Sequence, residues 1–168
     1  KLSDGNIRGA EPRYMLRVAD TLYRTGHAHE ATQMLHDATI ANNELNDFGS
    51  TPASTAVRNA NFLSSCAEVY LVFGDKNKAL ASYREAESLW RKVAGMEPQQ
   101  QVEADGQISR LCLLRGDLYA ASREGQPART QYQEAVDILS KLKARNQITL
   151  VGLKDLRKAQ QKLQALAG

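Results

Sequence analysis

The chain has 168 residues, of which 42% are hydrophobic, 6% aromatic and 24% charged, which is the balance of one soluble domain able to bury a core. Its 4 prolines and 11 glycines are too few for long disordered stretches. The net charge of +3, with both signs interspersed, does not argue for a nucleic-acid ligand. The longest apolar run, Val69–Phe73, is far shorter than the roughly 18 residues of a membrane helix.

The start of the chain, Lys1-Leu2-Ser3-Asp4, has no methionine, no apolar signal core and no basic amphipathic transit pattern. We therefore expect a soluble fragment of a longer protein, and any membrane span or catalytic domain of that protein would lie upstream. Cys66 and Cys112 stand among Leu, Ala and Val on predicted helices, which is typical of buried free thiols. Free rather than disulfide-bonded cysteines favour a reducing compartment, so we expect a cytoplasmic protein. The alternative is a soluble extracytoplasmic domain of a membrane-anchored protein.

Helical periodicity, interrupted by glycine and proline, predicts seven helices and no strand. Each of the four prolines precedes or opens a helical pattern, where its missing N–H costs nothing. The predicted helices span about 11–24, 29–45, 52–73, 76–93, 99–122, 127–143 and 149–167. Gly106, inside the fifth helix, predicts a kink or a break there. The last helix is amphipathic, as a helix that covers the end of a stacked array must be.

One spacing of small and large residues occurs three times, with steps of 3, 9, 4 and 3. A small residue opposite a large one lets two short antiparallel helices pack closely, so the pattern predicts stacked helical repeats. The three copies are Ala19, Leu22, Ala31, Leu35 and Ala38; Ala67, Tyr70, Ala79, Tyr83 and Ala86; and Gly116, Tyr119, Ala128, Tyr132 and Ala135.

These three helix pairs resemble tetratricopeptide repeats, and the resemblance covers about 11–142. The copy at 63–86, LSSCAEVYLVFGDKNKALASYREA, matches best, whereas the first copy has leucine in place of the usual aromatics. The third copy lacks the glycine of the turn between its helices, where Arg123 falls, and has Gly125 two residues later.

Successive copies are offset by 48 residues (19 to 67) and 49 residues (67 to 116), against about 34 in the standard repeat. The chain is in this respect similar to the extended repeats of kinesin light chains. The segment 79–98 is also similar to repeat regions fused to bacterial serine/threonine kinases.

The tetratricopeptide resemblance implies a right-handed all-α solenoid that forms one domain over 1–168, with repeats at about 11–45, 52–93 and 99–143 and a capping helix at about 149–167. It also implies that the first helices of the pairs line a concave groove. An acidic residue follows the small residue of each copy, and this row should face the groove. The candidate groove residues are Arg13, Arg17, Asp20, Arg24, Asn61, Ser64, Glu68, Arg110, Leu113 and Asp117.

Because the row is acidic, we expect a basic or mixed-charge protein segment as ligand, and a clamp for a terminal carboxylate is disfavoured. The alternative interpretation of the acidic row is a solvated helix face, with Asp117 in an ion pair with Arg110 or Arg115. The basic C-terminal quarter, 141–162, is interpreted as a solvated helix face or as a surface for an acidic partner, since no aromatic residues alternate with its charges.

Other motifs are interpreted as coincidental. Asp47-Phe48-Gly49 matches a kinase tripeptide but lacks the other kinase motifs, and 115–117 matches an adhesion tripeptide but lies mid-helix. His27, His29 and His36 have no further ligand at metal spacing. The Ser/Thr-rich segment 50–55 either caps the third helix or is phosphorylated.

The sequence therefore predicts a non-catalytic protein–protein interaction module, for example the regulatory region of a bacterial signalling kinase. The alternative is a structural spacer or a homo-oligomerisation element formed through the last helix. No nucleophile–base pair, phosphate loop or carboxylate dyad stands out, so we expect no enzymatic activity in this chain, no cofactor or metal, no nucleic-acid ligand and no membrane contact.

Overall fold

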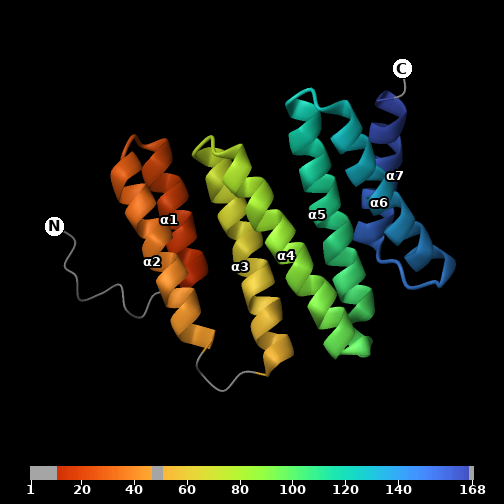
Figure 1. The fold of residues 1–168 in the computed structure, drawn as a ribbon, viewed down its shortest axis with the longest axis horizontal. Coiled ribbons are helices and arrows are strands. Elements are labelled where there is room, and N and C mark those ends of the chain that lie inside the picture. Colours follow the sequence, from red (N-terminus) through yellow and green to blue (C-terminus); the bar gives the residue numbers. More distant parts are fainter. Residues whose placement is uncertain (1–10, 47–50, 167–168) are drawn as a thin grey trace. The chain divides into compact units, whose positions relative to one another are not determined.

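A computed structural model describes residues 11–46 and 51–166, and over these residues the chain is helical with no strand. The prediction of an all-α protein is thereby confirmed. The helices lie within about three residues of their predicted bounds (Figure 1). They are α1 (Pro12–Arg24), α2 (Ala28–Asn46), α3 (Pro52–Val72), α4 (Lys76–Met96), the short 3-10 helix η1 (Pro98–Gln100), α5 (Gln101–Ala121), α6 (Gly125–Ala144) and α7 (Leu150–Ala165).

The structure divides into two compact units, with the boundary inside α4 between Ala86 and Glu87. The first unit contains α1, α2, α3 and the first part of α4. The second contains the rest of α4, η1, α5, α6 and α7. Each unit has its own apolar core and is described separately below.

The core of the first unit lies among α1, α2 and α3. The antiparallel pair of α1 and α2 is visible in Figure 1, and α3 packs mainly against α1. Small residues such as Ala19 and Ala38 are fully buried there, so that the two helices approach closely. The buried residues of this core are Met15, Leu16, Ala19, Leu35, Ala38, Phe62, Cys66 and Val69.

The second unit is built on the pair of α5 and α6, against which α7 packs, mainly on the α6 side. Leu139, Leu142 and Leu156 form one apolar cluster where α6 meets α7. Gly152 and Ala159 are also buried on α7, which covers α6 with its apolar face. The amphipathic last helix thus packs on its own chain in this structure.

Proline and threonine side chains determine where several helices begin. Pro12 and Pro52 stand in the first turns of α1 and α3, and Pro98 opens η1. The Thr51 hydroxyl accepts a hydrogen bond from the backbone N–H of Ser54 at 3.1 Å. The helix-capping role predicted for this segment is therefore confirmed.

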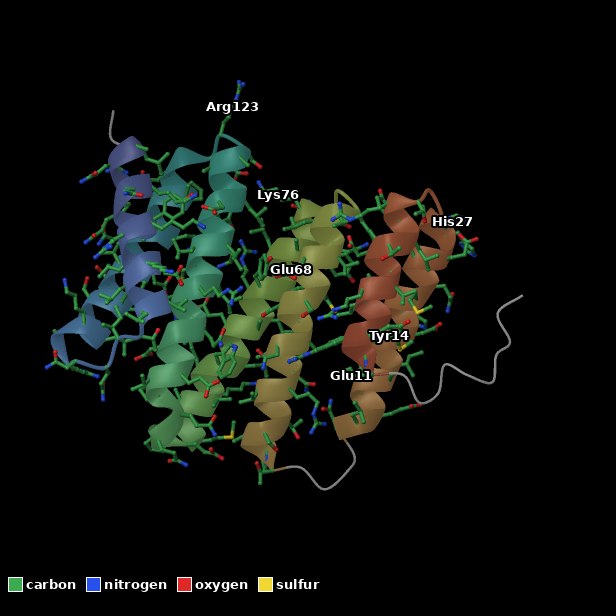
Figure 2. All side chains as sticks on the ribbon, turned by 180° about the vertical axis from the view of Figure 1, so that it is seen from behind. Glu11, Tyr14, His27, Glu68, Lys76 and Arg123 are labelled. Atoms are coloured by element: carbon green, nitrogen blue, oxygen red, sulfur yellow. The ribbon has the colours of Figure 1, made fainter. Side chains whose placement is uncertain are left out.

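The turns that join the helices of each pair share one backbone geometry. Gly26, Gly74 and Arg123 occupy equivalent places after α1, α3 and α5, with φ of +88°, +75° and +61°. The next residue in each turn donates its N–H to the carbonyl five residues back, as from Asp75 to Tyr70 at 2.8 Å. The missing glycine of the third copy therefore leaves the backbone geometry of the turn unchanged. Arg123, labelled at this turn in Figure 2, has the left-handed φ that glycine has in the other two turns.

Replacing Arg123 with glycine is expected to raise the free energy of unfolding by about 0.5–1 kcal/mol, because a side chain in the left-handed region is strained. The measurement is urea unfolding. Arg145→Gly is the matched control, since this arginine ends α6 at an ordinary φ of −91°, and there the substitution should destabilise the protein. If both variants lose stability equally, the Arg123 turn is not strained.

Gly106 does not break α5, so the break predicted at this position was wrong. The helix runs without interruption from Gln101 to Ala121. One interior glycine costs a helix only about 1 kcal/mol, which is too little to end a helix of this length. A Cβ added at Gly106 would meet no atom within 4 Å, so close packing does not require the glycine.

Candidate functional site

A groove in the first unit lies between α1 and α3 and has a volume of about 400 Å³. On α1, the charged side chains that line it are spaced by one helical turn or two, so they share one face. Half of the predicted groove residues meet here, namely Arg13, Arg17, Asp20, Arg24 and Glu68. The remaining lining residues are Leu16, Ser65, Val69 and Val72, which make the floor largely apolar.

The charges of this groove are only partly compensated within the chain. Arg24 donates to the Asp20 carboxylate at 2.8 Å, which forms an exposed ion pair. No hydrogen bond or ion pair joins the side chains of Arg13, Arg17 or Glu68 to another residue in the described ranges. Glu68, on α3 in Figure 2, is exposed. The groove thus offers two guanidinium groups and one carboxylate without partners above an apolar floor.

The other predicted groove residues lie elsewhere. Asn61 lines a neighbouring pocket together with Arg13, and the half-buried Ser64 donates its hydroxyl to the Ala60 carbonyl at 2.8 Å. In the second unit, Arg110 lines a separate pocket. Leu113 is buried, with 3% of its surface exposed, and so offers no contact surface to a ligand.

Asp117, the third member of the acidic row, is bound within the second unit. Its carboxylate accepts from Lys162 at 2.5 Å and from the Tyr132 hydroxyl at 2.7 Å, and Lys158 lies 3.6 Å away. Burial opposes the charge, but the hydrogen bonds from Lys162 and Tyr132 and the nearby ammonium groups outweigh it, so the pKa of Asp117 is lowered. The predicted tie to Arg110 or Arg115 was wrong, because the partners come from α6 and α7.

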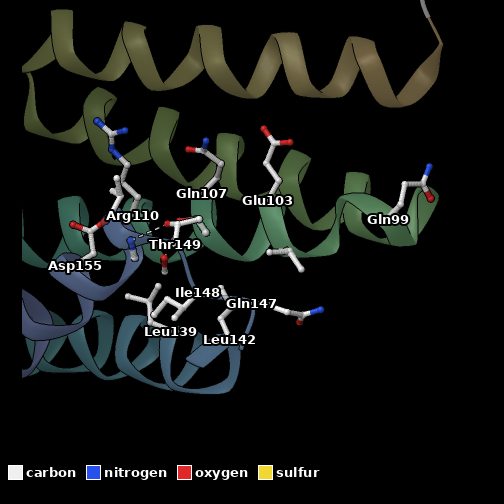
Figure 3. Close-up of a pocket in the computed structure, with 15 residues that line it drawn as sticks. Gln99, Glu103, Gln107, Arg110, Leu139, Leu142, Gln147, Ile148, Thr149 and Asp155 are labelled. Atoms are coloured by element: carbon white, nitrogen blue, oxygen red, sulfur yellow. Dashed lines mark hydrogen bonds between the residues drawn. The ribbon is translucent and has the colours of Figure 1, made fainter. Parts of the chain in front are cut away.

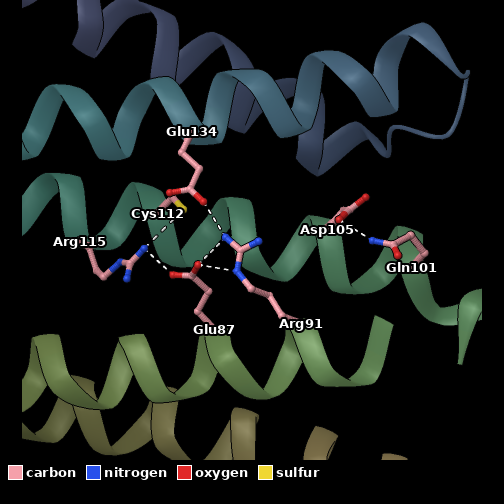
Figure 4. A network of polar contacts seen from close by, with 7 residues as sticks. All are labelled: Glu87, Arg91, Gln101, Asp105, Cys112, Arg115 and Glu134. Atoms are coloured by element: carbon pink, nitrogen blue, oxygen red, sulfur yellow. Dashed lines mark hydrogen bonds and ion pairs between the residues drawn. The ribbon is translucent and has the colours of Figure 1, made fainter. Parts of the chain in front are cut away.

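The second unit contains a network of ion pairs that the sequence interpretation missed (Figure 4). Arg115 pairs with Glu87 at 2.5 Å, and 8% and 12% of their side-chain surfaces are exposed. Arg91 bridges Glu87 and Glu134, both at 2.6 Å. Because Arg115 and Glu87 continue the buried stripes of their helices, periodicity was the signal that could have revealed them. The network joins α4, α5 and α6, and we interpret it as structural.

Both cysteines are buried, as predicted, and have free thiols. Burial raises the pKa of each to about 12, which disfavours the reactive thiolate. The Cys112 sulfur also accepts a weak contact from Arg115 at 3.7 Å.

We expect native Cys66 and Cys112 to react with a disulfide reagent at least about a thousandfold more slowly than in urea, since reaction needs an opening of the structure. Single-cysteine variants separate the two signals. Cys66 reports on the first unit and Cys112 on the second. Fast labelling of one thiol under native conditions would contradict its burial.

The remaining motifs do not form a site. His27, His29 and His36 are exposed, and within 11–46 and 51–166 no group of three or more His, Cys, Asp or Glu side chains could hold a metal ion. Arg115 and Asp117 of the adhesion-like tripeptide are both engaged inside the second unit. The kinase-like tripeptide includes positions 47–49, which lie outside the described residues.

Among the helices described, none is both long enough and apolar enough to span a membrane. Comparison with known proteins gives no match to a family model, to a curated protein or to a solved structure. The groove between α1 and α3 therefore has to be interpreted from its own chemistry.

Proposed function

We propose that this chain is a non-catalytic protein-interaction module of stacked helical hairpins, and that the groove between α1 and α3 binds a segment of another protein. The observation that carries the proposal is the set of unpartnered charges, Arg13, Arg17 and Glu68, above the apolar floor of that groove. Charged groups at the rim orient a ligand and accelerate its association, while apolar contacts below them supply affinity.

The same charges favour a mixed-charge segment as ligand. An acidic residue of the segment would meet Arg13 and Arg17, and a basic residue would meet Glu68. Asp20 contributes less than the acidic row suggests, because Arg24 already neutralises it. Of the two kinds of ligand expected from the sequence, basic and mixed-charge, these charges therefore favour the mixed-charge segment.

Reversing the groove charges tests this function. We expect the double variant Arg13→Glu and Arg17→Glu to bind the partner about tenfold more weakly, since exposed pairs contribute up to about 1 kcal/mol each. Glu68→Lys should weaken binding by a smaller factor. Both variants should keep the helicity of the parent protein because these side chains make no internal ion pair in the described structure.

The experiment is capture of partners from the source lysate, followed by titration of the recovered partner. Arg157→Glu on α7 and Glu30→Lys on α2 are matched controls, because both residues are exposed and neither lines the groove. Equal binding by groove variants and controls would remove the groove from the proposal. Recovery of only the protein itself would favour the spacer or oligomerisation alternative.

A further inference from the structure

A second pocket lies wholly within the second unit and is not part of the α1–α3 groove. It has a volume of about 480 Å³, within the roughly 300–1,000 Å³ of ligand-binding pockets. Figure 3 shows it between α5, the segment before α7, and the start of α7. The apolar lining residues are Val102, Leu139, Leu142, Ile148 and Val151.

The floor of this pocket is continuous with the core of the unit. Leu139 and Leu142 belong to the apolar cluster between α6 and α7, and Val102 and Ile148 pack against that cluster. Val151, at the mouth, keeps 64% of its surface exposed. An apolar group that entered the pocket would therefore contact both a preformed floor and an exposed apolar rim.

Gly106 keeps the pocket open. It lies inside α5 and lines the pocket, and a Cβ added there would meet nothing within 4 Å. By contrast, Gly116 on the same helix faces the ring of Tyr132. Packing thus requires a glycine at 116 but not at 106. The effect of Gly106 is to leave space on the pocket wall.

The charged groups at the mouth are two carboxylates and one guanidinium. Glu103 and Arg110 are exposed on α5, and Asp155 is half-buried on α7. No ion pair within 4 Å involves any of them in the part of the chain that the structure describes. Figure 3 shows Arg110 and Asp155 toward the same end of the pocket and Glu103 farther along α5. The surplus charge at the mouth is negative.

We propose that this pocket receives an aliphatic side chain from a partner segment that carries a basic residue beside it. The apolar floor takes the aliphatic group, and Glu103 and Asp155 attract the neighbouring cation. The pocket belongs to a different unit from the groove, so this proposal stands or falls separately from the proposed groove function.

The probe is the peptide N-acetyl-Lys-Leu-Lys amide, titrated into the labelled protein while amide shifts are followed by NMR. We expect a Kd of about 1 mM, as for a short unconstrained ligand, with the largest shifts at Val102, Gly106 and Ile148. The same peptide with alanine in place of leucine should bind at least tenfold more weakly. Shifts confined to other residues, or none at all, would overturn the proposal.

Gly106→Leu fills the pocket from its wall and should weaken binding at least tenfold. Gly95→Leu is the matched control, because Gly95 is also helical with open space around it but does not line the pocket. Glu103→Lys should weaken binding of the lysine peptide and strengthen binding of N-acetyl-Glu-Leu-Glu amide. Full binding by the folded Gly106→Leu variant, or indifference to the Glu103 charge, would contradict the proposal.

Discussion

Replacing Glu87 with glutamine should lower the free energy of unfolding by about 3–4 kcal/mol. Glu87 is the carboxylate that pairs with Arg115, whose side chain is only 8% exposed. Removing one partner of a buried pair leaves an uncompensated charge in a medium of low polarity. The Nε of Arg115 already lacks a hydrogen-bond partner within the described residues, so the network has no spare acceptor. Urea unfolding followed by the fluorescence of the buried Trp90 in the same unit measures the loss.

Two further variants distinguish the contribution of the buried Glu87–Arg115 pair from that of the more exposed Glu87–Arg91 pair. Arg91→Gln removes a side chain that is 52% exposed, so its cost should be within about 1 kcal/mol. The double variant Glu87→Leu with Arg115→Met removes both charges and should recover most of the stability lost in Glu87→Gln. A small effect of Glu87→Gln alone would show that water compensates Arg115.

The second large effect is expected from Gly116→Ala, which should cost about 1–3 kcal/mol. A Cβ at Gly116 would overlap the ring of Tyr132. That ring is 2% exposed and its hydroxyl is held by Asp117 at 2.7 Å, so it cannot easily move away. Gly106→Ala, in the same helix, should instead raise stability by about 0.5–1 kcal/mol because alanine has the higher helix propensity.

Thermal or urea unfolding of the two alanine variants gives the sign of each effect directly. Adding Tyr132→Leu to Gly116→Ala should restore part of the loss, since the first copy already combines Ala19 with Leu35 in one buried cluster. Equal effects of Gly106→Ala and Gly116→Ala would show that helix propensity, and not contact with Tyr132, determines the result.

The helix order could be predicted from sequence because local signals coincide in this chain. Pro12 and Pro52 begin helices, and Gly26 and Gly74 form the turns between the two helices of a pair. The small–large spacing identifies residues that are mostly buried. Arg123 shows the limit of such reasoning. Its turn has the glycine geometry without the glycine, because the hydrogen bonds of the turn outweigh the local strain.

The site could be predicted only in part, because burial and pairing depend on neighbours far away in sequence. The tetratricopeptide resemblance implied a groove along the first helices of the pairs, and Arg13, Arg17, Asp20 and Arg24 of α1 line one groove with Glu68. Asp117 could not be assigned in this way, because its partner Lys162 is 45 residues away. The spacing pattern shows where small and large residues alternate. It does not show which charged residues pair with the lysines of α7.

The central claim is that a protein segment occupies the groove between α1 and α3, and site-specific photo-crosslinking tests it most directly. A photoreactive residue replaces Arg24 in the groove, and in a second variant it replaces Gln33, which is exposed on α2 outside the groove. We predict that position 24 crosslinks to one partner segment, that position 33 does not, and that Arg13→Glu with Arg17→Glu markedly lowers the yield of the crosslink. Equal crosslinking at both positions, or a yield that the charge reversal leaves unchanged, would contradict the account.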